Sequence, residues 1–222
     1  MIDLIAFLGN PEREYGGTRH NAGRLLAREL PFYGDLHWEK KFHGLYAVMD
    51  GASLARFGGA ETGGMAQGGG RAGRLHFIIP ETYMNNAGES VRDTASFFRI
   101  PPERVIAVHD ELELPPGVVG LKFGGGLGGH NGLRSLRACL GTPDFWRLRI
   151  GIGRPGDREP GRGGPEGVHG DISGWVLSPF TAGEKSVLTE VLRAAAEALA
   201  AALSSGAESL LPEWNKKRIV PA

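Results

Sequence analysis

Cysteine is nearly absent from this sequence, and so is any long run of apolar residues. The single cysteine, Cys139, excludes a disulfide within the chain. No apolar stretch approaches the roughly 20 residues that a membrane-spanning helix needs, and no signal-peptide pattern is recognisable. We therefore expect a protein of a reducing, cytoplasmic setting that does not enter a membrane.

The sequence also lacks a net charge. It contains 25 basic and 25 acidic residues, so the chain as a whole has no long-range attraction for a polyanion. Any site for a nucleic acid must then be a local patch. With 222 residues, of which 41% are hydrophobic, the chain is long enough for a stable core without disulfides or structural metals.

Glycine, in contrast, is abundant, with 36 residues. Two segments, 57–74 and 157–170, are rich in glycine and contain almost nothing apolar to bury. This composition is typical of a flexible excursion. Because neither segment has the character of a linker between two folded units, we expect both to be loop insertions in a single domain that spans residues 1–222.

Short apolar runs alternate with segments of helical periodicity along the chain. The runs that we predict as strands are 2–8, 45–49, 75–79, 105–108, 118–123 and 148–152. The segments that we predict as helices begin near 21, 90, 133 and 181. Asn21 is a natural cap for the first, and a capping-box pattern of Thr181 with Glu184 opens the last one. The alternation predicts an α/β fold, a single domain with a mixed, largely parallel central sheet flanked by helices.

Polar residues recur where a predicted strand gives way to a helix or a loop. These residues are Asn10, His20, Asn85, Asp110 and Asn131. Ligands of open α/β sheets bind at the edge formed by the carboxyl ends of the strands. Three amides, one imidazole and one carboxylate at that edge would form a polar, nearly neutral cleft that suits amide and ester groups. Asp110 could accept one ring N–H of a histidine, which would leave the other nitrogen free to take a proton from water.

Each of these residues also has a purely structural interpretation. Asn10 could cap a turn, and His20 could be an ordinary surface residue. Asn85 or Asn86 could cap a helix with Glu89 as the capping-box partner, and Asn131 could support the neighbouring glycine turns. The pattern by itself leaves both interpretations open.

A dinucleotide site is a second class of function to consider. Residues 124–129 and 151–156 both match G-x-G-x-x-G, and Asp144 follows the first match at about the distance of a ribose-binding acid. However, His130 and Asn131 replace the small apolar residues that normally pack such a helix against its strand. The second match runs into Pro155 and a loop instead of a helix.

A metal site is a third class. His109, Glu111 and Glu113 alternate, and on a strand they would share one face. The prolines at 115 and 116 favour a loop there instead, and no second cluster of histidine or cysteine completes a ligand shell. We therefore expect no metal.

Five motifs in a fixed order resemble the successive signatures of bacterial peptidyl-tRNA hydrolase. They are GNPEREYGGTRHNAG, PETYMNNAGESV, HDELELPPG, KFGGGLGGHNGLRSL and RLRIGIGRPGD. With the strands between them they cover most of residues 3–156. The resemblance implies a single α/β domain that acts as a monomer, without cofactor or protein partner, and that cuts the ester joining a peptide to the 3′ end of tRNA.

The resemblance also implies roles for particular residues. His20 resembles the catalytic base of the family and Asp110 the carboxylate that orients it, while Asn10 is assigned with them to catalysis. The residues implied in substrate binding are Tyr15, Asn85 and Asn131, and those implied in binding the acceptor arm of tRNA are Lys122 and Arg149.

Other arginines lie close to these positions in sequence and suggest a local basic patch for phosphate contacts. They are Arg134, Arg137, Arg147 and Arg154. The chain departs from the family at Gly120 and Ile79, where relatives often carry a basic residue. The alternative to an enzyme is a catalytically silent RNA-binding relative on the same fold.

Overall fold

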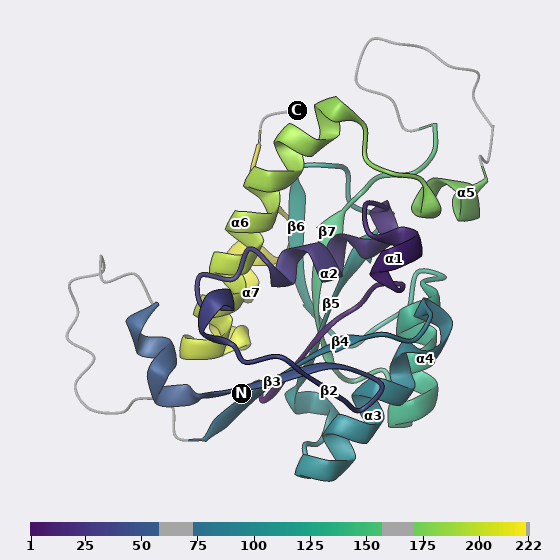
Figure 1. The fold of residues 1–222 in the computed structure, drawn as a ribbon. Helices are drawn as coiled ribbons and strands as arrows, with labels where there is room; N and C mark the ends of the chain where they lie inside the picture. The colour runs from purple at the N-terminus through teal and green to yellow at the C-terminus, as the bar shows by residue number, and fades with distance from the viewer. Residues whose placement is uncertain (58–72, 157–170, 221–222) are drawn as a thin grey trace.

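The chain folds around one sheet of eight strands (Figure 1). The computed structural model describes residues 1–57, 73–156 and 171–220. The predicted insertions, 57–74 and 157–170, lie outside these residues except at their margins, so they stay predictions. The strands are β1 (Leu4–Phe7), β2 (Glu39–Lys41), β3 (Gly44–Asp50), β4 (Arg74–Pro80), β5 (Val105–Glu111), β6 (Val118–Phe123), β7 (Trp146–Gly151) and β8 (Lys217–Arg218).

The centre of the sheet is parallel and its two margins are antiparallel. The strand order is β2-β3-β4-β1-β5-β7-β6-β8. β1 pairs in parallel with both β4 and β5, and β5 pairs in parallel with β7, whereas β2, β3, β6 and β8 join antiparallel. The carboxyl ends of the four central strands therefore meet at one edge, and the predicted α/β fold with a mixed sheet is confirmed.

Helices cover both faces of this sheet (Figure 1). They are α1 (Glu12–Tyr15), α2 (Ala22–Ala27), α3 (Ala87–Phe98), α4 (Asn131–Leu140), α5 (Ile172–Leu177), α6 (Ala182–Ser205) and α7 (Ala207–Trp214). The 3-10 turns are η1 (Arg19–Asn21), η2 (Tyr33–Asp35), η3 (Gly51–Arg56), η4 (Met84–Asn86) and η5 (Pro102–Arg104). No helix in the described parts of the chain is long and apolar enough to cross a membrane.

Side-chain alternation along β1 builds two cores. Ile5 and Phe7 point into the core formed with α2, α6 and α7, whereas Leu4 and Ala6 point into the core formed with α3 and α4. All four residues are completely buried, as a central strand covered on both faces requires. The capping box predicted for Thr181 and Glu184 is present at the start of α6.

The structure corrects two local predictions. β5 continues through His109, Asp110 and Glu111, so these residues belong to the strand and do not follow it. Their register with β7 explains the extension, because Asp110 pairs with Ile150. Asn21 does not cap α2 with its side chain, which instead bonds the backbone of Asn10.

The dinucleotide interpretation is also wrong. A dinucleotide-binding unit needs a helix that crosses between two parallel strands. Here α4 follows β6 and leads into β7, and these two strands are antiparallel.

Gly23 allows the turn that carries His20 to lie directly against the sheet. A Cβ at this position would stand 2.2 Å from the carbonyl oxygen of Val108 and 2.8 Å from that of Leu8. Both contacts are backbone atoms, one in β5 and one in the residue that follows β1, and they cannot move aside as a flexible side chain can.

We therefore expect Gly23→Ala to lower the free energy of unfolding by about 2 kcal/mol or more, in the range of overpacking substitutions. Gly17→Ala in the same motif is the matched control, because its Cβ would meet nothing within 4 Å. Urea denaturation of both variants measures the difference. Equal stability of the two would show that α2 does not depend on this close approach.

Candidate active site

A cleft of about 530 Å³ opens at the carboxyl edge of the central strands. Its walls come from the turn after β1, from η1, η4, α4 and α5, and from the end of β5. The structure brings together six of the residues singled out in the sequence, and all of them line this cleft. They are Asn10, Tyr15, His20, Asn85, Asp110 and Asn131.

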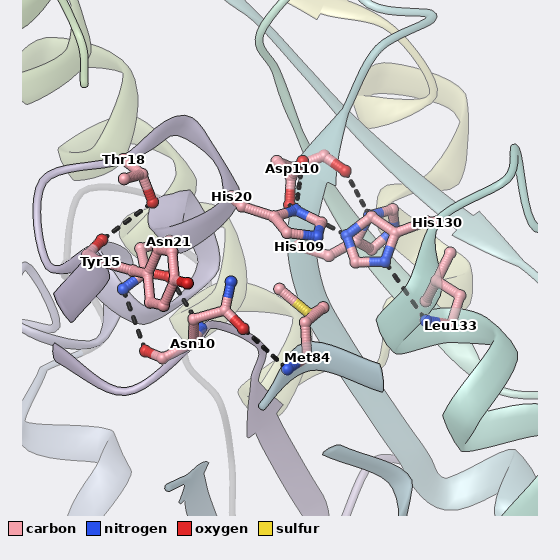
Figure 2. A network of polar contacts seen from close by, with 10 residues as sticks. All are labelled: Asn10, Tyr15, Thr18, His20, Asn21, Met84, His109, Asp110, His130 and Leu133. Carbon is pink, nitrogen blue, oxygen red and sulfur yellow. Dashed lines mark hydrogen bonds and ion pairs between the residues drawn. The ribbon is translucent and has the colours of Figure 1, made fainter. Parts of the chain in front are cut away.

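His20 and Asp110 form a direct pair in this cleft (Figure 2). The Nδ1 atom of His20 lies 2.9 Å and 3.0 Å from the two carboxylate oxygens of Asp110. His20 belongs to η1 and Asp110 to β5, and the contact exists because η1 packs against β5. Asp110 is 2% exposed and His20 is 6% exposed, so water does not compete for this bond.

A second histidine contacts the same carboxylate. The Nε2 atom of His130 lies 2.9 Å from Oδ1 of Asp110, and its Nδ1 atom accepts the backbone N–H of Leu133 at 3.3 Å (Figure 2). A backbone N–H can only donate, so Nδ1 of His130 carries no proton. The proton of that ring is therefore on Nε2, where it is donated to Asp110.

This chain of bonds fixes the state of His20. Asp110 accepts from His130, and as a carboxylate it also accepts from Nδ1–H of His20. The Nε2 atom of His20 is then the nitrogen with a free lone pair. Burial alone would raise the pKa of Asp110, but the electrostatic attraction of His130 and His20, together with the hydrogen bonds from their rings, outweighs that effect and holds its pKa well below the usual range.

His109, Glu111 and Glu113, the alternating residues considered as a metal site, do not form a ligand cluster. His109 is 1% exposed, its Nδ1 atom contacts the backbone oxygen of Asp110 at 2.7 Å, and its burial lowers its pKa well below the ordinary value. Among the described residues, the group with ligand atoms close enough for one ion is His20, Asp110 and His130, within 4.8 Å of one another. Both nitrogens in that group carry protons directed at Asp110, so an ion would have to displace them.

Asn10 is held by three hydrogen bonds that orient its amide. Its Oδ1 atom accepts the backbone N–H of Met84 at 2.8 Å (Figure 2). Its own backbone N–H and carbonyl group bond the side chain of Asn21 at 2.8 and 3.1 Å. Because Oδ1 is occupied by Met84, the amide N–H₂ of Asn10 is the group left to serve as a donor in the cleft.

The remaining amides lie at the rim. Asn85 is an exposed residue of η4, and α3 has no side-chain cap, so the capping interpretation of Asn85 is wrong. Asn131 is the exposed first residue of α4, where its Oδ1 atom accepts from Arg134 at 3.4 Å. Tyr15 packs edge-on against Tyr83, with ring centroids 6.5 Å apart.

Lys122 and Arg149 do not line the cleft. Lys122 is half-buried on β6. Arg149 on β7 is 7% exposed, and its guanidinium donates to the carbonyl oxygen of Asn215 at 2.9 Å and lies 4.0 Å from Glu111. Gly120 makes room for this arrangement, since a Cβ there would lie 2.7 Å from both Arg149 and Asn215.

The predicted basic patch is wrong in one member. Arg147 is 2% exposed and donates to the carbonyl oxygens of Gly125, Gly126 and Pro143, so it supports the glycine loop from inside. Arg134 and Arg137 are exposed on α4. Ile79, at the other departure from the family pattern, belongs to the core.

Sequence reasoning did not identify His130 as part of the site. Its signal was its place directly before Asn131, at the start of a predicted helix, where a side chain can cap the helix and still reach the strand edge.

Comparison with known proteins places the chain in a family. The family model described as peptidyl-tRNA hydrolase matches residues 4–221. A variant peptidyl-tRNA hydrolase of Acinetobacter baumannii with one Arg-to-Gln substitution is 31% identical, covers 99% of this chain and 97% of its own, and superimposes with a TM-score of 0.77.

Two further structures agree with it. The A. baumannii enzyme without that substitution is 32% identical, covering 99% of this chain and 97% of its own, with a TM-score of 0.75. A complex of peptidyl-tRNA hydrolase with N-propanol is 33% identical, covering 100% of this chain and 97% of its own, with a TM-score of 0.75. The chain therefore belongs to the peptidyl-tRNA hydrolase family.

Proposed function

We propose that this protein hydrolyses the ester between a peptide and the 3′ end of tRNA, with His20 as general base. The observation that carries the proposal is the arrangement around Asp110. Two ring N–H groups converge on one buried carboxylate, and the proton on Nδ1 of His20 leaves its Nε2 atom as a base within the cleft. Membership of the peptidyl-tRNA hydrolase family supports the choice of substrate.

The reaction follows from this arrangement. Nε2 of His20 takes a proton from a water molecule, and the hydroxide oxygen forms a bond to the ester carbonyl carbon. The amide N–H₂ of Asn10 donates to the oxyanion that develops. When the intermediate collapses, the bond to the 3′ oxygen of the ribose breaks, and the imidazolium returns the proton to that oxygen. General-base assistance of this kind contributes about 10²- to 10⁴-fold, and one oxyanion donor about 10²-fold or more.

Substrate binding is assigned to the rim of the cleft. Asn85 and Asn131 expose amides that can bond the backbone of a peptide, and Tyr15 offers an aromatic surface beside them. Because backbone groups are the same in every peptide, such contacts make hydrolysis insensitive to peptide sequence. The independence from cofactors and protein partners, the monomeric state and the cytoplasmic location stay predictions.

Contact with the acceptor arm of tRNA is assigned to Lys122 and Arg149. The two residues lie on the neighbouring strands β6 and β7. Lys122 is the more accessible of the two and supplies the phosphate contact, whereas Arg149 anchors the backbone of Asn215 beside it.

The role of His20 as the base can be tested by removing its side chain. We expect His20→Ala to lower kcat/KM for release of N-acetyl-aminoacyl groups from tRNA by at least about 10²-fold, because it removes the general base. Binding of tRNA should be unchanged. His37→Ala, at an exposed histidine outside the cleft, is the matched control, and brief preincubation of the wild type with EDTA should have no effect.

Full activity of His20→Ala would contradict the assignment of the base. A wild-type protein that binds tRNA but releases nothing would instead favour the silent RNA-binding relative. Loss of activity after chelation would point to a metal in the reaction.

The phosphate contact assigned to Lys122 can be tested through the salt dependence of tRNA binding. Lys122→Ala should weaken tRNA binding and reduce the slope of log K against log salt by about 1, as loss of one phosphate contact does. Lys40→Ala is the control, because Lys40 lies on β2 at the opposite end of the sheet from β6. Titrations at several salt concentrations measure both slopes. An unchanged slope for Lys122→Ala, or an equal change in both variants, would remove Lys122 from the interface.

A further inference from the structure

Arg19 stands one residue before His20 and is 3% exposed, although an arginine side chain keeps its charge. A buried charge needs partners, and Arg19 finds them more than 150 residues away in the chain. Its Nη2 atom lies 2.8 and 2.7 Å from the two carboxylate oxygens of Glu184. Its Nη1 atom donates to the hydroxyl of Ser178 and, at 2.9 Å, to the carbonyl oxygen of Pro179.

The guanidinium of Arg19 also stacks on the ring of Trp175, with 3.7 Å between its Cζ atom and the ring centroid. Trp175 belongs to α5, and its indole N–H donates to the carbonyl oxygen of Gly153 at 2.9 Å. A backbone hydrogen bond joins the same two segments, since the N–H of Arg19 donates to the carbonyl oxygen of Ser178 at 3.1 Å. We call these contacts of Arg19 with Trp175, Ser178, Pro179 and Glu184 the Arg19 clamp.

The segment held by this clamp forms one wall of the cleft. Ile172, Val176 and Leu177 of α5 line it together with His20. Yet α5 has no buried residue, and Ile172 and Leu177 are 41% and 37% exposed. Only the half-buried Trp175 and Val176 of this six-residue helix pack against the core, so the clamp supplies much of what fixes the position of α5.

We propose that Arg19 is a positioning residue: by clamping α5 to η1, it fixes the apolar wall of the cleft relative to the imidazole of His20. The short turn η1 thus carries the base His20. Through Arg19, η1 also positions α5, the apolar surface that receives the substrate next to that base. The inference rests on the proposed function, because it assigns α5 to the substrate side of that reaction. It predicts that a weakened clamp affects substrate binding more than the chemical step.

Glu184 allows a test that leaves the neighbourhood of His20 untouched. It is the third residue of α6, where it forms a capping box with Thr181. Burial raises the pKa of Glu184, but hydrogen bonds from Arg19 and Thr181 outweigh this effect, so its pKa is lowered and the clamp is an ion pair. A hydrogen bond between two charged groups is stronger than one to a neutral amide.

The chain offers a matched pair of variants. Glu184→Gln removes the charge opposite Arg19 but keeps a residue that can complete a capping box. Thr181→Ala removes the cap of α6 but leaves the carboxylate opposite Arg19. A defect that stems from α6 alone should be larger in Thr181→Ala, whereas a defect in the clamp should appear only in Glu184→Gln.

We expect Glu184→Gln to speed hydrogen exchange of the α5 amides by about tenfold and to raise KM by about five- to tenfold, with kcat within about twofold of wild type. Thr181→Ala should lower Tm without either effect. Glu184→Asp, which keeps the charge, should restore part of the protection. Wild-type exchange and KM in Glu184→Gln, or the same defects in Thr181→Ala, would overturn the proposal. Hydrogen exchange tests the clamp even if the wild type does not hydrolyse peptidyl-tRNA. The proposed function and the role of Arg19 can therefore be contradicted separately.

Discussion

The structure of the site depends on one buried carboxylate and the two ring N–H groups that it accepts. An ionised carboxylate that is 2% exposed is stable only with hydrogen-bonding partners, and Asp110 obtains them from His20 and His130. Asp110 and its two partners come from three different parts of the fold. β5 carries Asp110 to the carboxyl edge of the sheet, η1 presents His20, and the N-cap position of α4 presents His130. The same three elements contribute to the walls of the cleft, together with the turn after β1, η4 and α5, so the contacts that position the base also help to form the cleft.

The direction of these hydrogen bonds determines which nitrogen acts as the base. The chain of bonds begins at the backbone N–H of Leu133, which leaves Nε2 of His130 to donate to Asp110, and it ends at the free Nε2 atom of His20. A neutral histidine that only supports a carboxylate thus determines which nitrogen of another histidine acts as base. The Arg19 clamp fixes the geometry in a second way, because it joins the turn that carries the base to α5, a wall that otherwise meets the core only through half-buried side chains.

Much of the fold could be predicted because its signals are local. Apolar runs such as Leu4–Phe7 mark central strands, and the capping box of Thr181 and Glu184 marks the start of α6. The junction residues His20 and Asp110 could be placed at one edge because parallel strands end together. The contacts that were missed depend on distant parts of the chain. Arg147 looked like a surface charge, yet it is buried on a central strand under a loop from residues 124–129, and nothing in its sequence neighbourhood indicates this. The second role of Glu184, opposite Arg19, is likewise a contact across 165 positions.

The state of the His20 ring tests the account most directly. Nitrogen-15 NMR of the histidine side chains at neutral pH distinguishes the two neutral tautomers, and the signals of His20 are those missing from His20→Gln. We expect a proton on Nδ1 of His20 and an unprotonated Nε2, together with the opposite tautomer for His130. A proton on Nε2 of His20, with Nδ1 bare beside Asp110, would contradict the arrangement on which both the base and its orientation depend.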